Sequence, residues 1–353
     1  MKVCILGSGL VSLTLAKSLV NLGLYVDIYS ENQIIRNKNR TIGISKTNVE
    51  FFNRHIFNIK KLLWNIKSIE IYSEILNNEK ILSFYDKNNL FSILKNDRLL
   101  HLLINQLKKN KLVSFKKIKI SDKILNNYNL IFNCDFKNSL TKKYFYNKFS
   151  KDYKSTAYIS TFNHVKIKND TAIQIFTSKG PFAFLPVSEK ETSVVFSFRG
   201  NEKIDLVKKI KQINPKYKII SIKNSSSFKL NSFFLRSYYY KNVLAFGDLL
   251  HKIHPLAGQG FNMSLRDIKS LLEIIKFRLK NGLDLDSSIC SEFEESMRHK
   301  NYIFNNGIDF IYELFYLETK TKNKLLGKSI KYLGKNRIIK KFLTRIADHG
   351  VNI

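Results

Sequence analysis

The residues best suited to chemistry lie in a loop over residues 247–260, in the C-terminal half of the chain. The loop holds an aspartate, two histidines and three glycines, and it connects an apolar run at 243–246 to a segment whose apolar residues recur every three or four positions. This pattern predicts a buried strand, a loop and an amphipathic helix. Free N–H groups at a helix start suit a negative or electron-rich ligand. We therefore predict a ligand loop here; a plain strand–turn–helix connection is the alternative.

Individual residues of the loop suggest separate roles. Gly258 and Gly260 let the backbone approach a ligand, because no side chain is in the way. Asp248, just after the strand, can accept hydrogen bonds from hydroxyl groups. His251 and His254 lack the further ligands that a usable metal site needs, so we predict no metal site. For these two histidines, two alternatives stay open: proton transfer, or side chains that only hydrogen-bond locally or face water.

A second glycine-rich turn occurs near the N-terminus. Apolar runs predict strands over Lys2–Leu6 and Tyr25–Tyr29, with a turn over 7–12 and a helix over 13–22 between them. This order is that of a strand–helix–strand unit, with which dinucleotide-binding domains begin.

The residues of this turn fit a nucleotide. Gly7 and Gly9 match the first two glycines of GxGxxG, and Ser12 stands at the third. Gly9 lets a pyrophosphate approach the backbone. Glu31 follows the second strand 19 positions after Ser12, close to the separation of about 20 expected for a ribose-binding acid. The residues predicted to bind the dinucleotide are Gly7, Gly9, Leu10, Val11 and Glu31.

The loop also carries a family resemblance. Its sequence HPLAGQGFN, at residues 254–262, resembles the second flavin-binding motif of the para-hydroxybenzoate hydroxylase superfamily. It is most similar to the motif of the ubiquinone-biosynthesis branch. In that family the aspartate that corresponds to Asp248 binds the ribityl chain of FAD. The backbone of the GQG segment faces the pyrimidine edge of the isoalloxazine ring. Leu249 and Leu250 replace two alanines of the usual wording, which we expect to add bulk near the flavin. The resemblance implies FAD contacts from Asp248, Gly258, Gln259, Gly260, Phe261 and Asn262.

Two further segments resemble flavin-contacting parts of the family. Residues 40–45 (RTIGIS) resemble its RTxALS segment, in which the arginine, here Arg40, lies close to the FAD. A solvated loop arginine is the alternative. Residues 94–103 resemble the segment that returns to the flavin domain, and Asn96 falls at its FAD-contact position.

Residues 180–186 (GPFAFLP) resemble the family segment GPxAxLP, whose strand faces substrate and flavin. Phe184 on this strand and Pro255 in the loop are therefore candidate neighbours of the flavin ring. For Phe182 and Phe184, a place in the plain core of the sheet is the alternative. No catalytic side chain is assigned, because in this family the cofactor carries the chemistry.

One segment departs from the family pattern. Residues 128–139 resemble the third motif, a strand that ends in Asp-Gly and supports both FAD and the nicotinamide cofactor. Here Phe136 follows Asp135 in place of the glycine. If the backbone needs positive φ at this position, phenylalanine is costly there. The departure bears on NAD(P)H use more than on FAD binding, and it leads us to expect slow or partner-assisted flavin reduction.

The resemblance extends over nearly the whole chain and implies an α/β fold. It consists of a Rossmann-like FAD-binding domain, a mixed-sheet substrate domain and C-terminal helices. The predicted boundaries are 1–66, 88–150 and 236–290 for the FAD-binding domain, 67–87 and 151–235 for the substrate domain, and 291–353 for the helical region.

The activity that the resemblance implies is that of an FAD-dependent monooxygenase. It would use NAD(P)H and O2 to hydroxylate a lipid-soluble aromatic ring, a polyprenylated phenol of ubiquinone biosynthesis, through a flavin hydroperoxide. Two alternatives stay open. One is a flavin-dependent reductase or dehydrogenase of the same fold; the other is a non-catalytic FAD-binding subunit of a membrane-associated complex, for which Phe136 is the support.

Composition narrows the setting and the partners. The 353 residues carry a net charge of +32, but the lysines are scattered and no nucleic-acid-binding motif is visible. We expect an anionic membrane surface and a ubiquinone-biosynthesis complex as partners, and no nucleic acid. The three cysteines show no metal or disulfide spacing, which fits a reducing compartment. Without a signal peptide or a run of about 20 apolar residues, we predict a cytoplasmic protein, or one held peripherally at the inner membrane face.

The C-terminal segment is the candidate membrane contact. Its apolar residues fall on one helical face by their spacing, with basic residues around them. Such a basic amphipathic helix can lie in the headgroup region of a bilayer; a helix packed on the protein with its lysines in water is the alternative. The apolar face consists of Ile338, Ile339, Phe342, Leu343 and Ile346, and the basic residues are Arg337, Lys340, Lys341 and Arg345.

Overall fold

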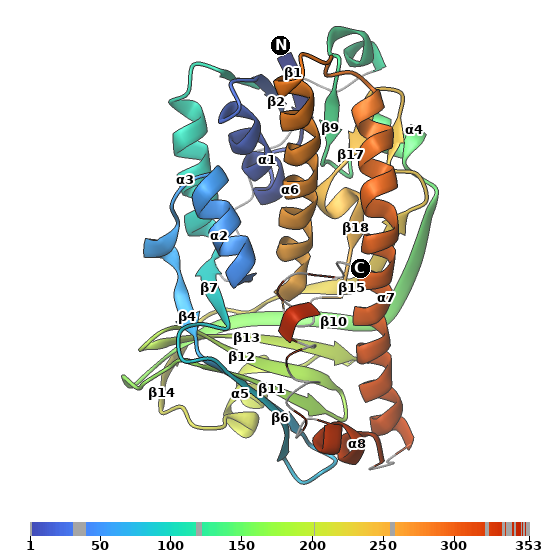
Figure 1. The fold of residues 1–353 in the computed structure, drawn as a ribbon. Coiled ribbons are helices and arrows are strands. Elements are labelled where there is room, and N and C mark those ends of the chain that lie inside the picture. Colours follow the sequence, from blue (N-terminus) through green and yellow to red (C-terminus); the bar gives the residue numbers. More distant parts are fainter. Residues whose placement is uncertain are drawn as a thin grey trace.

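The computed structural model of the chain describes residues 2–30, 40–117, 122–200, 202–254, 258–321 and 325–333, and residues 336, 341, 344–346, 348 and 350. Figure 1 shows a parallel sheet with helices packed against it in the upper part of the molecule and a broad mixed sheet below. The predicted α/β class, with C-terminal helices, is confirmed.

The parallel sheet forms the first layer. Its strand order is β16-β17-β9-β1-β2-β8, and all neighbours are parallel except β16 and β17. The strands read as short apolar runs because the core covers them, including the helices α1 (Leu10–Val20), α3 (Asn96–Lys108) and α6 (Gln259–Lys280). The strands are β1 (Lys2–Leu6), β2 (Tyr25–Tyr29), β8 (Val113–Lys116), β9 (Ile131–Asn133), β16 (Tyr239–Tyr240) and β17 (Val243–Ala245).

The carboxyl ends of the parallel strands define the functional edge of this sheet. β1, β9 and β17 are adjacent and parallel, and Gly7, Asp135 and Gly247 follow close after their ends. In open α/β sheets, ligands bind at this edge. The predicted strand–helix–strand start is confirmed, although helix α1 (Leu10–Val20) begins and ends earlier than predicted.

The broad sheet forms the second layer. Its order is β18-β15-β10-β13-β12-β11-β5-β6, with β14 paired to β10, and only the β5–β11 pair among its described strands is parallel. Helix α5 (Leu206–Ile213) packs on one face over a phenylalanine-rich cluster. The strands are β5 (Ser68–Ser73), β6 (Glu79–Tyr85), β10 (Lys148–His164), β11 (Thr171–Thr177), β12 (Gly180–Ser188), β13 (Glu191–Arg199), β14 (Ile219–Ile222), β15 (Ser226–Leu235) and β18 (His251–Lys252).

A small antiparallel sheet and short helices connect the layers. The sheet has the order β3-β7-β4, and β3 is followed directly by α2, as β7 is by α3. These elements are β3 (Thr41–Ser45), β4 (Trp64–Ile66), β7 (Phe91–Lys95), α2 (Lys46–His55), α3 (Asn96–Lys108), α4 (Ser139–Tyr144), and the 3-10 turns η1 (Lys60–Leu62), η2 (Asp122–Asn127) and η3 (Gly247–Leu249).

Three helices complete the fold. α6 (Gln259–Lys280) crosses the parallel sheet, α7 (Ser288–Thr321) runs beside α6 and continues past the broad sheet, and α8 (Leu325–Leu333) lies near β6 (Figure 1). In the part of the chain that the structure describes, no helix combines the length and the apolar character needed to cross a bilayer.

The predicted membrane helix falls mostly outside the described residues, and this includes Ile338, Ile339, Phe342 and Leu343 of its apolar face. Ile346 of that face is described, and it packs against a core cluster that contains Ile253. At this one position the structure agrees with the alternative of a segment packed on the protein.

Candidate functional site

A cavity of about 480 Å³ lies between the loop, the small sheet and the broad sheet. Arg40 and much of the predicted flavin loop line this cavity, so residues that are far apart in the sequence lie close together there. From the loop and its flanks it is lined by Asp248, His251, Lys252, Ile253, Gly258, Gln259, Gly260, Phe261 and Asn262. From the broad sheet it is lined largely by apolar side chains, among them Ile69, Phe84, Ile159, Pro181, Ala183, Leu185, Val195 and Leu230.

The start of α6 presents bare backbone to this cavity. Gly258 caps the helix in the left-handed region, with φ of 65°, which glycine adopts at little cost. A Cβ atom built there would lie 3.4 Å from the Gly43 nitrogen, so the loop and β3 approach each other closely. At Gly260 such an atom would meet nothing within 4 Å. The N–H groups of the first turn of a helix lack intrahelical partners, so this end is a suitable place for an electron-rich ligand edge.

The side chain of Asn262, on α6, forms hydrogen bonds with β3. Its Nδ2 donates to the Gly43 carbonyl at 3.1 Å. Its Oδ1 accepts from the Ser45 N–H at 2.9 Å and from Asn48 Nδ2 at 3.0 Å, and the side chain is buried. The sequence suggested a ligand contact here, but the side chain holds the cavity wall together, and any ligand contact would come from its backbone.

The first-strand turn and the loop meet at the edge of the parallel sheet. Gly7 has φ of 108°, and its N–H donates to the Tyr29 carbonyl at 2.8 Å. Gly247 has φ of 64°, and a Cβ atom there would lie 2.9 Å from Cγ1 of Val11. Both positions therefore need glycine. The contact brings the turn after β1 against the loop after β17, as a ligand that spans both would require.

Asn96 forms a backbone hydrogen bond with Arg40 outside the cavity lining. It begins α3, is buried, and its backbone N–H donates to the Arg40 carbonyl at 3.0 Å. Arg40 lines the cavity, whereas Asn96 is not among its lining residues. Glu31 and Pro255, the predicted ribose-binding acid and one candidate ring neighbour, lie outside the described residues.

The two loop histidines are both buried. His251 Nε2 contacts the carboxylate of Asp267 on α6, and that carboxylate also accepts from Asn301 Nδ2 at 3.0 Å. His254 packs between the rings of Tyr153 and Tyr312, with centroids at 4.8 and 4.1 Å.

Burial is the main cause that lowers the pKa of His254, to about 3, so its imidazole is neutral. Within the described ranges, no three His, Cys, Asp or Glu side chains gather as metal ligands would. His251 is held by a polar contact to α6, whereas His254 makes ring contacts to β10 and α7 and neither of its nitrogens has a hydrogen-bond partner among the described residues. Proton transfer stays a prediction.

Alternation along β12 decides which side chains face the cavity. Pro181, Ala183 and Leu185 line it, and Phe182 and Phe184 point to the opposite face, because successive side chains of a strand alternate. Both phenylalanines are fully buried in the cluster below α5. The expectation that Phe184 neighbours the flavin ring is corrected: it is a core residue, and Ala183 and Leu185 are on the cavity side.

Comparisons with known proteins agree with this geometry. A family model described as "FAD binding domain" matches residues 182–284. The p-nitrophenol 4-monooxygenase PnpA of Pseudomonas putida has a similar structure, with a TM-score of 0.80 at 12% identity over 99% of this chain and 98% of its own. HpxO of Klebsiella pneumoniae, solved with FAD, has a TM-score of 0.76 at 11% identity and covers 99% of both chains.

The chain has the fold of the FAD-dependent monooxygenases.

Similar sequences confirm the predicted resemblance to the para-hydroxybenzoate hydroxylase superfamily and its ubiquinone branch. The ubiquinone biosynthesis monooxygenase COQ6 of Schizosaccharomyces pombe is 21% identical over 63% of this chain and 57% of its own length. The ubiquinone hydroxylase UbiL of Rhodospirillum rubrum is 26% identical over 46% of this chain and 41% of its own. The chain thus spans about half the length of these relatives.

Two departures from the family motifs, at Leu249–Leu250 and at Phe136, can be placed in this fold. Leu249 and Leu250 are buried in the main core and do not line the cavity, so the expected bulk near the flavin is corrected. Phe136 is not among the described residues with positive φ, and its half-exposed ring packs edge-on against Phe233 at 5.7 Å. The backbone cost considered for Phe136 therefore does not arise, and its effect on NAD(P)H use stays a prediction.

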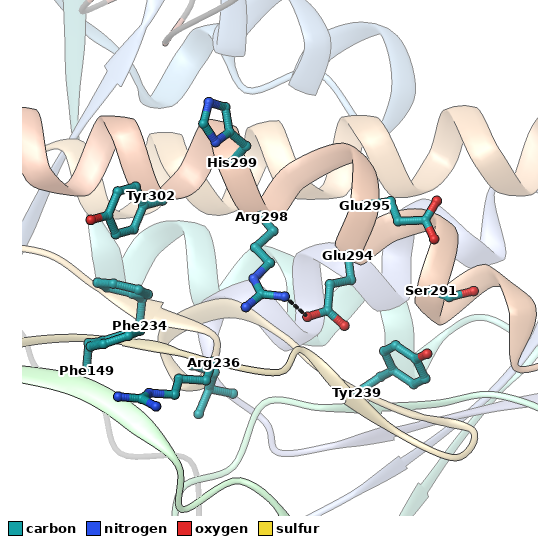
Figure 2. Close-up of a pocket in the computed structure, with 11 residues that line it drawn as sticks. Phe149, Phe234, Arg236, Tyr239, Ser291, Glu294, Glu295, Arg298, His299 and Tyr302 are labelled. Carbon is teal, nitrogen blue, oxygen red and sulfur yellow. Dashed lines mark hydrogen bonds and ion pairs between the residues drawn. The ribbon is translucent and has the colours of Figure 1, made fainter.

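A second hollow, of about 510 Å³, lies between α7 and the strands β10, β15 and β16 (Figure 2). Three of its charged side chains, Glu294, Arg298 and Arg236, have local partners. Arg298 pairs with Glu294 at 3.4 Å, and the guanidinium of Arg236 lies 4.2 Å from the centre of the Phe149 ring. None of the predicted flavin residues line this hollow, so the first cavity is the candidate site of a flavin monooxygenase.

Sequence reasoning missed several charged side chains of the cavity, which are Lys46, Asp86, Lys252 and Asp348. Lys252 lines the wall next to Asp248, and its Nζ donates to Asn231 Oδ1 at 2.6 Å. β18 is only two residues long, so alternation could not reveal which way Lys252 faces. The family wording gave no signal for it either, because it lies between the recognisable segments.

Proposed function

We propose that this chain is an FAD-dependent monooxygenase that uses NAD(P)H and O2 to hydroxylate an aromatic ring. Its substrate would be a lipid-soluble, polyprenylated phenol of ubiquinone biosynthesis. The observation that carries the proposal is the meeting of Arg40, Asp248 and the bare start of α6 around one cavity with apolar walls. The names of its relatives support the substrate class.

The residues present fit FAD. The amide oxygen of Gln259 is buried and has no hydrogen-bond partner among the described residues, so a ring N–H could satisfy it. The space in front of Gly260 is open, and Gly9 begins α1 without a side-chain cap, which leaves N–H groups for a diphosphate. We assign FAD binding to Gly7, Gly9, Leu10, Val11, Glu31, Arg40, Asn96, Asp248, Gly258, Gln259, Gly260, Phe261 and Asn262.

When bound, FAD supplies the redox chemistry and the reaction with O2. The chain supplies position and exclusion of water. Asp248 is exposed at the strand edge and can accept hydrogen bonds from ribityl hydroxyl groups. The apolar wall formed by Ile69, Ala183 and Leu185 is suited to an aromatic ring and its prenyl chain, and it limits side reactions with water. Pro255 stays a candidate ring neighbour.

The membrane partner is part of the same proposal. The net charge of +32 favours an anionic surface, and a lipid-soluble substrate is found there. We propose that the protein works peripherally at the inner membrane face, within a ubiquinone-biosynthesis complex and without a nucleic-acid partner.

Labelled oxygen tests the proposed reaction. Purified protein, NAD(P)H, labelled O2 and a prenylphenol should give a product with one labelled oxygen for each NAD(P)H consumed. Oxygen derived from water, or product formed without O2, would contradict hydroxylation and favour the reductase or dehydrogenase of the same fold.

A further inference from the structure

Lys252 is a cation in the wall of the candidate substrate cavity. It is half-buried on β18, beside Phe233 of β15, and its Nζ donates to Asn231 Oδ1 at 2.6 Å. Lys252 and Asn231 both line the cavity. An ammonium group has three N–H donors and no acceptor, so two donors remain after the contact with Asn231.

The surroundings of Lys252 do not neutralise it. In the described part of the chain, no carboxylate lies within ion-pair distance of its Nζ. Burial lowers the pKa of Lys252; Asp248 opposes this effect, and Arg40 and Lys148 add to it. The neighbouring charges are thus two cations and one anion. The balance at this end of the cavity is positive.

Two other groups on neighbouring strands leave this balance unchanged. Asp152 of β10 stands opposite Asn231 and stays charged, since among the described residues it accepts only from the Lys154 N–H at 2.8 Å, but it is not among the charges that shift the pKa of Lys252. Asn231 is exposed and neutral, so it orients the ammonium without cancelling its charge. A half-buried positive site of this kind favours the ionised form of a ligand oxygen.

We propose that Lys252, oriented by Asn231, binds the ionised oxygen of a phenolic substrate in this cavity. The proposal rests on the proposed function, because it takes the substrate to be a phenol. On binding, the phenol O–H bond breaks, the proton passes to solvent, and the electron pair stays on the oxygen beside the ammonium. The resulting phenolate is more electron-rich in its ring, which is the form that an oxidising electrophile attacks more readily. Lys252 would then select the reactive ionisation state as well as the position of the substrate.

The test uses 4-nitrophenol, whose ionised form is yellow. The probe is titrated into FAD-loaded, oxidised protein without NAD(P)H, and difference spectra against the same protein without probe give the ionised fraction of the bound probe. Wild-type protein should bind the probe more ionised than it is in free solution. In Lys252→Met the ratio of ionised to neutral bound probe should fall by about tenfold or more, and Lys252→Arg should keep most of it. Asn231→Asp should also lower the ratio, because a carboxylate would replace the neutral partner of Lys252.

Two controls separate this role from a structural one. Lys209→Met removes one exposed lysine from α5, away from the cavity lining, and should leave the ratio unchanged. 4-Nitroanisole, which cannot ionise, should bind wild type and Lys252→Met equally well. The proposal is overturned if wild type does not raise the ionised fraction, if Lys252→Met raises it as much, or if both ligands lose affinity together. No turnover is needed, so a failure of the labelled-oxygen experiment with an intact ionisation shift would count against hydroxylation alone.

Discussion

At the scale of single residues, buried polar side chains shape the site. Asn262 joins α6 to β3 and α2 through three hydrogen bonds, and His254 stands between two tyrosines with both ring nitrogens unpartnered among the described residues. The first is satisfied and holds the wall of the cavity. His254 is buried with its imidazole neutral, because burial disfavours the protonated form. These two side chains therefore make different predictions for stability.

Asn262→Ala should destabilise the protein. It leaves the Gly43 carbonyl and the Ser45 N–H buried without their partner, and each such loss costs about 1–3 kcal/mol. We expect the free energy of unfolding to fall by about 2–4 kcal/mol in urea titrations. Asn105→Ala, at a more exposed amide on α3 that contacts His101, is the control and should change little. If Asn262→Ala lowers the free energy of unfolding no more than Asn105→Ala does, the Asn262 side chain does not stabilise the contact between α6 and β3.

His254 should make stability depend on pH. Its pKa is lowered from 6.5 to about 3 in the folded protein, so the unfolded chain binds more protons between these values. Stability should therefore be fully present above pH 6.5 and fall as the pH drops toward 3, by about 2 kcal/mol at pH 5. His254→Phe should remove that part of the dependence, and His299→Phe, at an exposed histidine, should keep it. Parallel pH profiles for wild type and His254→Phe would contradict the assignment.

At the scale of elements, strand alternation divides roles along β12. Ala183 and Leu185 face the cavity, and Phe182 and Phe184 face the core under α5. The family resemblance pointed to this strand but could not fix which of its faces lines the cavity, because the aromatic residues are suited to either face. Only the register with β13 and β11 settles this.

Neighbouring positions on β12 should therefore respond in opposite ways. Ala183→Leu should fill part of the cavity and weaken substrate binding. Because the added atoms enter open space, the change in stability should stay below the about 1–3 kcal/mol of overpacking in a filled core. Phe184→Leu should lower the free energy of unfolding by about 1–3 kcal/mol, with less effect on the affinity for substrate. Calorimetric binding of a phenol and thermal unfolding measure both. A loss of affinity at Phe184 with unchanged stability would reverse the assignment of the faces.

Several elements could be predicted from the sequence because local signals suffice for them. The bounds of β1 and β2 follow from apolar runs, and a connection after β17 follows from its glycines. The predicted loop 247–260 is too uniform, because it contains η3 and β18 and α6 already begins at Gln259. Other features depend on contacts between segments that are distant in the sequence, and no local pattern encodes such contacts. These features are the burial of Leu249 and Leu250, the hydrogen bonds of Asn262 to β3 and the orientation of Lys252. The predicted domain boundaries stay a prediction.

At the scale of the whole molecule, charge and shape suggest where the protein works. The chain combines a net charge of +32 with a cavity that has apolar walls. Thr344 and Asp348, near the C-terminus, line the cavity, and Asp348 Oδ1 accepts from the Thr47 N–H at 3.0 Å. The described C-terminal residues therefore close the site, and a membrane contact would depend on the exposed basic side chains.

Binding to anionic liposomes tests the membrane proposal. The protein should co-sediment with them at low salt and dissociate as salt rises, because screening shortens the range of the attraction. Lys341→Glu with Arg345→Glu, at two exposed positions, should weaken binding, since each basic residue near such a surface contributes roughly 1 kcal/mol. Lys209→Glu with Lys211→Glu on α5 is the matched control. Equal binding by both double variants would exclude the C-terminal segment as the contact.

Flavin uptake is the most direct test of the proposal that the cavity beside Asp248 holds FAD. Purified protein titrated with FAD should become yellow and quench the flavin fluorescence at one FAD per chain. Asp248→Ala should bind FAD at least about tenfold more weakly, because a hydrogen bond to a charged group contributes about 1.5–3 kcal/mol, and Asp284→Ala, at an exposed aspartate after α6, should bind normally. A colourless protein that takes up no flavin, or an Asp248→Ala variant with unchanged affinity, would show that FAD does not bind in this cavity through Asp248.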